Sequence, residues 1–192
     1  MNPEKITHSK LIDIGRSWLN SAYSPSLDHG HKPCSIILTE PYASTRYNEI
    51  PDIFAVCDLW HGKILTVLIE CKVSRSDFYA DQKKVCRLMK EGIGGQRWYL
   101  APEGIIPIEK LPEKWGLLEV SKFKELKIIK RPELQERDKD SEMNIIVNLV
   151  KRLNILPDDH IGIRKFKPLV GFKPSKKRAE FYIQGEENER NT

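Results

Sequence analysis

Two acidic side chains and a lysine stand in segments of the chain that otherwise resemble buried strands. Asp52 opens the segment "DIFAVCDLW", and Glu70 and Lys72 lie near the end of "KILTVLIECKV". An isolated charge in an apolar site is unfavourable, so it is normally paired, hydrogen-bonded or bound to a metal. These three residues are therefore candidates for chemistry or for a structural ion cluster.

The two segments predict an antiparallel hairpin that closes around His61. Asp52 and Glu70 each lie nine residues from position 61, so they should face each other across the strands at roughly 5 Å. Because strand side chains alternate between faces, Glu70 and Lys72 should share one face while Cys71 points to the other. The pattern predicts two carboxylates and an ammonium group in one place.

Two carboxylates this close repel each other unless a proton or a divalent cation lies between them. Oxygen ligands from Asp52, Glu70 and the main-chain carbonyl of Cys71, with Glu40 as a further candidate, fit Mg²⁺ or Mn²⁺. Lys72 would then hold or deprotonate an attacking water and offset charge on phosphate oxygens. A salt-bridge cluster that only satisfies its own charges is the alternative.

The elements that must position these residues follow from hydrophobic periodicity and turn signals. We expect a mixed sheet with helices on its faces. The expected helices are residues 6–23, a helix capped by Ser76 and running to about Met89, and residues 140–156; the expected strands are residues 34–40, 50–60, 63–73, 96–102 and the end of 109–120.

Pro51-Asp52 followed by Glu70-Cys71-Lys72 matches the PD-(D/E)XK signature, so the chain resembles the restriction-endonuclease-like nuclease superfamily. The resemblance implies an α-β-β-β-α-β core in which Asp52 and Glu70 bind the metal and Lys72 is catalytic. The flanks "IECKVSRSDFYADQKK", "RWYLAPEGII" and "LPEKWGLLEV" resemble small bacterial and prophage members linked with DNA repair. They imply DNA as the substrate, and they place Arg75 and Lys83 in the same signature.

Basic residues gather in two places that suit contacts with DNA phosphates. One group follows the lysine of the motif, and the other is the run "RKFKPLVGFKPSKKR" at 164–178, with seven basic and no acidic residues. A solvated tail is the alternative explanation of this run. The DNA-binding candidates are Arg75, Lys83, Lys84, Arg87, Lys173, Lys176, Lys177 and Arg178.

The chain of 192 residues has room for one domain with an appendage. We expect a nuclease-like core at 1–130, a helical extension at 131–163 that packs on the core, and a basic then acidic tail at 164–192. No segment is apolar enough to span a bilayer or to act as a secretory signal, which favours a cytoplasmic protein. The four separated cysteines are expected to be reduced core residues.

These observations favour a Mg²⁺- or Mn²⁺-dependent endodeoxyribonuclease in DNA repair, restriction or phage DNA processing. The alternative is a DNA-binding or nuclease-accessory protein that has the same fold and does not cut. The sequence leaves a homodimer or a partner protein open.

Overall fold

The structure, a computed structural model, describes residues 6–21, 33–40, 49–59, 63–89 and 91–153. All of the elements in these ranges belong to one unit, Met1–Arg152. They follow each other as α1 (His8–Leu19), β1 (Ile36–Thr39), β2 (Ile53–Asp58), β3 (Ile64–Cys71), α2 (Arg75–Asp81), α3 (Val85–Leu88), β4 (Gln96–Pro102), a 3-10 helix (Ile108–Lys110), β5 (Gly116–Val120), β6 (Leu126–Lys130) and α4 (Lys139–Arg152).

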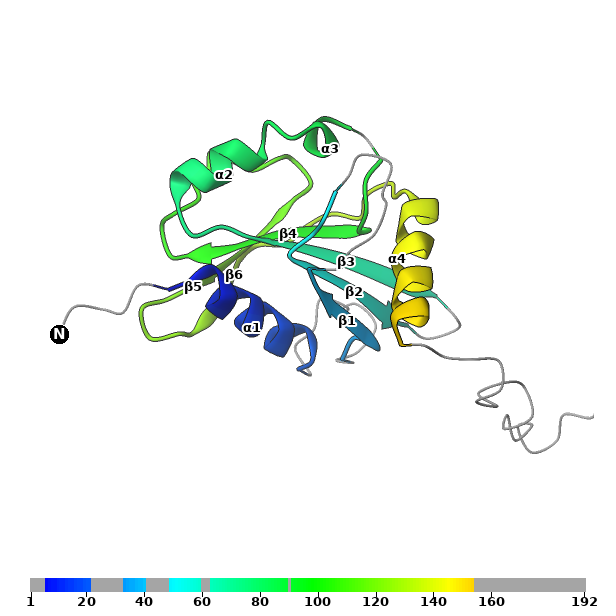
Figure 1. Ribbon diagram of the computed structural model, residues 1–192. Coiled ribbons are helices and arrows are strands. Elements are labelled where there is room, and N and C mark those ends of the chain that lie inside the picture. The colour runs from blue at the N-terminus through cyan, green and yellow to red at the C-terminus, as the bar shows by residue number, and fades with distance from the viewer. Residues whose placement is uncertain (1–5, 22–32, 41–48, 60–62, 90, 154–192) are drawn as a thin grey trace, which may run out of the picture. The chain divides into compact units, whose positions relative to one another are not determined.

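The six strands form one sheet in the order β1-β2-β3-β4-β5-β6. The pairs β1–β2, β2–β3 and β5–β6 are antiparallel, whereas β3–β4 and β4–β5 are parallel. A parallel pair needs a crossover connection, and α2 and α3 lie in the one between β3 and β4. The sheet with helices on its sides (Figure 1) confirms the predicted mixed α/β class.

The central strand β3 is buried along almost its whole length because both faces of the sheet are covered. On one face, Leu11 and Trp18 of α1 pack with Ile69 and Cys71. On the other face, Leu68 belongs to a second cluster, which includes Phe78 of α2 and Ile145 of α4. Side chains alternate along a strand, so Glu70 and Lys72 point to the same face as Leu68.

The predicted hairpin register is confirmed. Asp58 pairs with Ile64 and Ile53 pairs with Ile69, so the pairing is centred on position 61. Residue 61 itself lies outside the described residues. Continued by one position, this register places Asp52 opposite Glu70.

The single helix predicted from Ser76 to about Met89 is wrong. Two short helices replace it, and the N-cap is Ser74, whose hydroxyl accepts the N–H of Asp77 at 3.1 Å. Asp77 Oδ2 in turn accepts the N–H of Val73 at 3.3 Å. The first of these bonds satisfies an N–H group that the first turn of a helix leaves without an intrahelical partner, and the second ties that turn to the end of the preceding segment. Lys84 has an extended backbone, which interrupts the helix.

Strand β6 was not expected, and one expectation for the cysteines is wrong. All four cysteines are buried. Cys34 and Cys57 form a disulfide, whereas Cys71 and Cys86 are free thiols. Among the described helices, none is both long and apolar enough to cross a bilayer.

Helix α1 approaches the sheet closely at Gly15. A Cβ atom added there would lie 2.6 Å from Ile53 Cδ1 and 3.1 Å from Leu100 Cδ2. The bare glycine therefore lets the helix backbone rest on the side chains of β2 and β4. This contact fixes the height of α1 above the sheet, and with it the position of His8 at the start of the helix.

We predict that Gly15→Leu lowers the free energy of unfolding by about 2 kcal/mol or more, because the larger side chain forces α1 away from a packed face. Urea denaturation would measure the change. Ser9→Leu is the matched control, since Ser9 lies on the exposed side of α1. Equal stability of the two variants would contradict a close contact at Gly15.

Candidate active site

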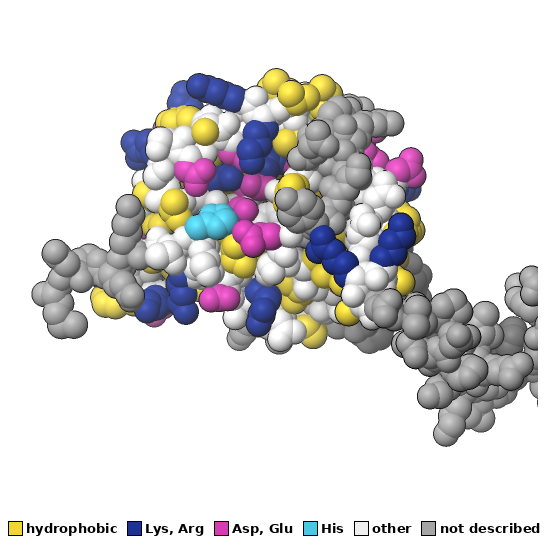
Figure 2. Space-filling model, in the orientation of Figure 1, with side chains coloured by type: hydrophobic (Ala, Val, Ile, Leu, Met, Phe, Trp, Pro, Cys, Tyr) yellow, Lys and Arg dark blue, Asp and Glu magenta, His cyan; other side chains and the backbone are white. Residues whose placement is uncertain are grey.

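Asp52 lies directly before β2, where three elements meet. Its Oδ2 atom accepts the main-chain N–H of Cys71 at 2.6 Å, which holds the side chain at the end of β3. His8 Nε2, on the first residue of α1, lies 3.3 Å from the same oxygen. Figure 2 shows a histidine side chain beside acidic ones at the surface, and His8 is the one histidine among the described residues.

Glu70 and Lys72 form a buried ion pair, as their shared face requires. Lys72 Nζ donates to Glu70 Oε2 at 2.9 Å and to Asp81 Oδ1 at 3.1 Å. Asp81 is the last residue of α2. The lysine therefore connects the end of the central strand to the helix above it, and all three side chains are at most 5% exposed.

Arg87 of α3 contacts three carboxylates that come from three segments. Its Nη1 pairs with Glu49, its Nε lies 2.8 Å from Asp81 Oδ2, and its Nη2 lies 2.8 Å from Glu70 Oε1. The guanidinium also lies over the Trp115 ring, 4.9 Å from its centroid. A planar group with donors on several sides suits this role, which an ammonium group could not fill in the same way.

Asp81 receives two further donors. Tyr99 Oη donates to its Oδ2 at 2.8 Å, and Lys84 Nζ lies 2.8 Å from its Oδ1. Tyr99 stacks on Trp115 and meets Phe78 edge-on. The aromatic side chains thus form an apolar wall behind the carboxylates, which keeps water away from the ion pairs and strengthens them.

The electrostatics of the cluster follow from this burial. Loss of solvent raises the pKa of Glu70 to about 6, although Arg87 and Lys72 act in the opposite direction and Asp52 raises it further. Loss of solvent also opposes the charge of Lys72, but the neighbouring Glu70 and Asp81 outweigh it and raise the pKa of that lysine above its usual range. Lys72 is therefore a fixed positive charge at neutral pH.

For Asp81, burial would raise the pKa, but the hydrogen bonds and charge of Arg87, together with Lys72 and Lys84, lower it well below the usual range. Asp81 is therefore ionised at neutral pH. The positive charges of Arg87, Lys72 and Lys84 thus stabilise the ionised form of this buried carboxylate.

Two carboxylate oxygens are the candidates for binding a divalent cation. Glu70 Oε1 is buried and makes no hydrogen bond, although Arg87 Nη2 lies 2.8 Å away in an ion pair. Both described contacts of Asp52 fall on Oδ2, which leaves Oδ1 for a ligand. In the described part of the chain no group of three histidine, cysteine or acidic side chains is arranged so that it could hold a metal ion. The donor set fits Mg²⁺, which binds through one or two carboxylates plus water and substrate phosphate.

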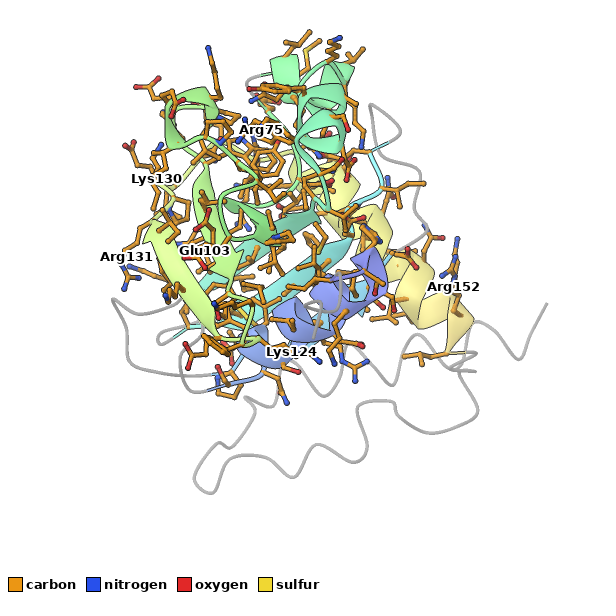
Figure 3. The ribbon with its side chains drawn as sticks, turned by 90° about the vertical axis from the view of Figure 1, so that its left-hand side faces the viewer. Arg75, Glu103, Lys124, Lys130, Arg131 and Arg152 are labelled. Atoms are coloured by element: carbon orange, nitrogen blue, oxygen red, sulfur yellow. A yellow bond between two sulfur atoms is a disulfide. The ribbon has the colours of Figure 1, made fainter. Side chains whose placement is uncertain are left out.

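Other predicted site residues lie nearby. The N–H of Glu40 donates to the Asp52 carbonyl at 2.9 Å, and the Glu40 side chain is exposed. Arg75, labelled in Figure 3, donates to the carbonyls of Gly104 and Ile105 in the loop after β4. Lys83 is exposed. Four of the predicted DNA-binding residues lie outside the described residues: Lys173, Lys176, Lys177 and Arg178. The role of the Cys71 carbonyl as a metal ligand stays a prediction.

The sequence analysis missed some residues of the site and assigned a different role to others. Glu49 was a candidate for a second metal site or a supporting role, and Asp81 was not considered. Lys84 and Arg87 were expected to contact DNA, whereas here they pair with carboxylates. One signal for Asp81 was available: it lies three residues after the buried Phe78, so it shares the inward face of α2.

Comparisons with known proteins give little further information. No protein-family model and no curated protein matches the chain. Among solved structures, a protein of unknown function from Silicibacter pomeroyi is 22% identical with a TM-score of 0.44, over 68% of this chain and 85% of that one. A similarity at this level carries no argument about fold or function.

The raised pKa of Glu70 makes a prediction about stability in the absence of metal. A carboxyl group with a higher pKa in the folded state stabilises the fold below its ordinary pKa of 4.5, and this contribution disappears as the pH rises through about 6. Relative to Glu70→Gln, the wild type should therefore lose about 2 kcal/mol of unfolding free energy between pH 4.5 and 7.

Urea denaturation at both pH values would measure this difference, with Glu109→Gln as the control for loss of an exposed carboxylate. A difference between wild type and Glu70→Gln that stays constant with pH would contradict the raised pKa.

Proposed function

We propose that this protein is a metal-dependent nuclease of the restriction-endonuclease-like fold that hydrolyses phosphodiester bonds in DNA. One observation carries the proposal: Asp52 accepts the N–H of Cys71 beside Glu70, where the β2–β3 register continued by one position would pair it with Glu70, and Lys72 Nζ lies 2.9 Å from Glu70 Oε2. The PD-(D/E)XK resemblance assigns metal binding to these carboxylates and catalysis to this lysine. The choice of DNA, and a role in repair, restriction or phage DNA processing, rest on that resemblance.

In this proposal Asp52 and Glu70 would hold one Mg²⁺ or Mn²⁺. The ion would supply Lewis-acid chemistry and a water of lowered pKa. Lys72 is already protonated because Glu70 and Asp81 raise its pKa, so it is unsuited to act as a base. Its ammonium group instead orients the water or stabilises negative charge on the phosphate oxygens.

Asp81 and Arg87 keep Lys72 and Glu70 in position. Asp81 accepts a hydrogen bond from Lys72, and Arg87 pairs with Glu70. Both side chains are held in turn by buried groups, including Tyr99. A reacting group that is fixed by packed neighbours needs little reorganisation in the transition state.

A second function has one observation in its favour. Lys72, Lys84 and Arg87 already neutralise the inner carboxylates, and the described residues supply no third acidic or histidine ligand. This arrangement suits a DNA-binding or nuclease-accessory protein that retains the fold but does not cut.

A cleavage assay separates the two functions. The purified protein would be incubated with single-stranded, duplex, flapped and mismatched DNA in Mg²⁺ or Mn²⁺. Lys72→Ala should reduce the cleavage rate about 10² to 10³-fold, as the loss of one transition-state donor does elsewhere, while DNA affinity changes little. Asp52→Asn should abolish metal-dependent cleavage, because it replaces a negatively charged carboxylate ligand of the metal by a neutral amide.

Lys63→Ala is the matched control, since Lys63 is an exposed lysine next to the other end of β3. Cleavage that persists at the wild-type rate in Lys72→Ala would refute the assigned role of this lysine. Salt-dependent binding without any cleavage would favour the accessory protein. A wild type that neither binds nor cuts DNA would leave the charged groups as a structural cluster.

DNA binding is predicted to depend on basic residues that are not members of the buried cluster. Replacement of Lys83, Lys173, Lys176, Lys177 and Arg178 by alanine should weaken binding to all sequences alike. The dependence of log affinity on log salt concentration should fall by about one unit for each phosphate contact that is lost. Fluorescence anisotropy at several salt concentrations would measure the slope, with Lys63→Ala as control. An unchanged slope would exclude these side chains from the DNA interface.

A further inference from the structure

Helix α3 buries its arginine and exposes its larger apolar side chains. The side chain of Arg87 is 3% exposed, whereas Val85 and Leu88 are 57% and 73% exposed. In most helices the apolar side chains are buried and the charged side chains are exposed. The contacts of Arg87 with Glu49, Glu70 and Asp81 therefore fix the orientation of this short helix, together with burial of Cys86.

In the ion pairs of the described residues around Arg87, negative and positive charges are equal in number without a metal. Glu49, Glu70 and Asp81 are in ion-pair contact with three permanent cations, Arg87, Lys72 and Lys84. Asp52 adds one more negative charge, and its described partners are the Cys71 N–H and the imidazole of His8. Among the described residues, the cluster therefore has one carboxylate, that of Asp52, that no permanent cation contacts within ion-pair distance.

This balance limits how well a divalent ion can bind alone. A bound Mg²⁺ or Mn²⁺ would convert one surplus negative charge into one surplus positive charge beside a buried guanidinium. A nearby like charge disfavours the charged state, most strongly where water is excluded. A phosphodiester carries one negative charge, which would restore the balance.

We propose that Arg87 is a built-in counter-ion that makes divalent-metal binding at Asp52 and Glu70 depend on a bound phosphodiester. This inference rests on the proposed metal site. It identifies Arg87 as a residue that regulates metal binding, in addition to its role in positioning Glu70. The free protein then binds metal weakly, and the metal and the DNA phosphate bind together.

The test measures Mn²⁺ binding through the EPR signal of free Mn²⁺, so that it does not depend on cleavage. In the absence of DNA, Arg87→Met should bind Mn²⁺ about tenfold more tightly than the wild type, because a charge next to an ionic site shifts its equilibrium by a factor of about ten or more. Arg87→Lys keeps the charge and should bind like the wild type.

Arg131→Met is the matched control, because Arg131 is an exposed arginine directly after β6, at the opposite edge of the sheet from β1. Its Mn²⁺ affinity should be unchanged. Equal or weaker Mn²⁺ binding by folded Arg87→Met would overturn the proposal, since Arg87 would then only hold the ligands in place.

A second measurement decides the matter even if Arg87→Met does not fold. A short DNA duplex should raise the Mn²⁺ affinity of the wild type about tenfold. The same titration with the Asp52→Asn protein measures the Mn²⁺ that the duplex itself binds, and this background is subtracted. No increase would overturn the proposal. If Asp52→Asn binds Mn²⁺ like the wild type in every condition, the metal site itself is wrong. If binding depends on Asp52 but not on Arg87 or DNA, only the present inference fails.

Discussion

The carboxylate of Glu70 is the group on which the arrangement around the site depends. It lies in the central strand, on a face covered by α2, and it is almost completely buried. An ionised group in such a place requires partners, because burial without them costs several kcal/mol. Lys72 and Arg87 supply the opposite charge, and each needs further carboxylates of its own. The course of the chain from β3 through α2 and α3 is consequently determined as much by ion pairing as by hydrophobic packing.

This dependence also explains which parts of the structure could be predicted from the sequence. The pairing of Asp52 with Glu70 follows from a hairpin centred on position 61 and from strand alternation, which are local rules. The roles of Asp81 and Arg87 depend on the break at Lys84, which turns α3 relative to α2. A continuous helical pattern contains no signal for that turn. The sequence therefore predicted the acidic pair and its lysine, but not the groups that hold them.

Long-range pairing accounts for the other differences. Cys34 and Cys57 are 23 residues apart and meet because β1 pairs with β2, and no CxxC spacing predicts this. Strand β6, for which no element was predicted, is a short segment with alternating exposure at the edge of the sheet. Such an edge strand takes its conformation from its neighbour β5, so its own composition is a weak predictor.

Stability alone is a poor explanation for so many charges in one buried place. A buried ion network is often no more stable than apolar side chains of the same volume, and loss of one member leaves the others uncompensated. Among the described residues, four carboxylates and three permanent cations nevertheless make the polar contacts around the end of β3, backed by Tyr99 and Trp115. The balance of these charges is close to neutral, and the group that departs from it is Asp52, which is also the more exposed of the two proposed metal ligands. A cluster built only for stability would gain from covering that carboxylate, whereas a cluster that receives a cation together with a phosphate needs it accessible.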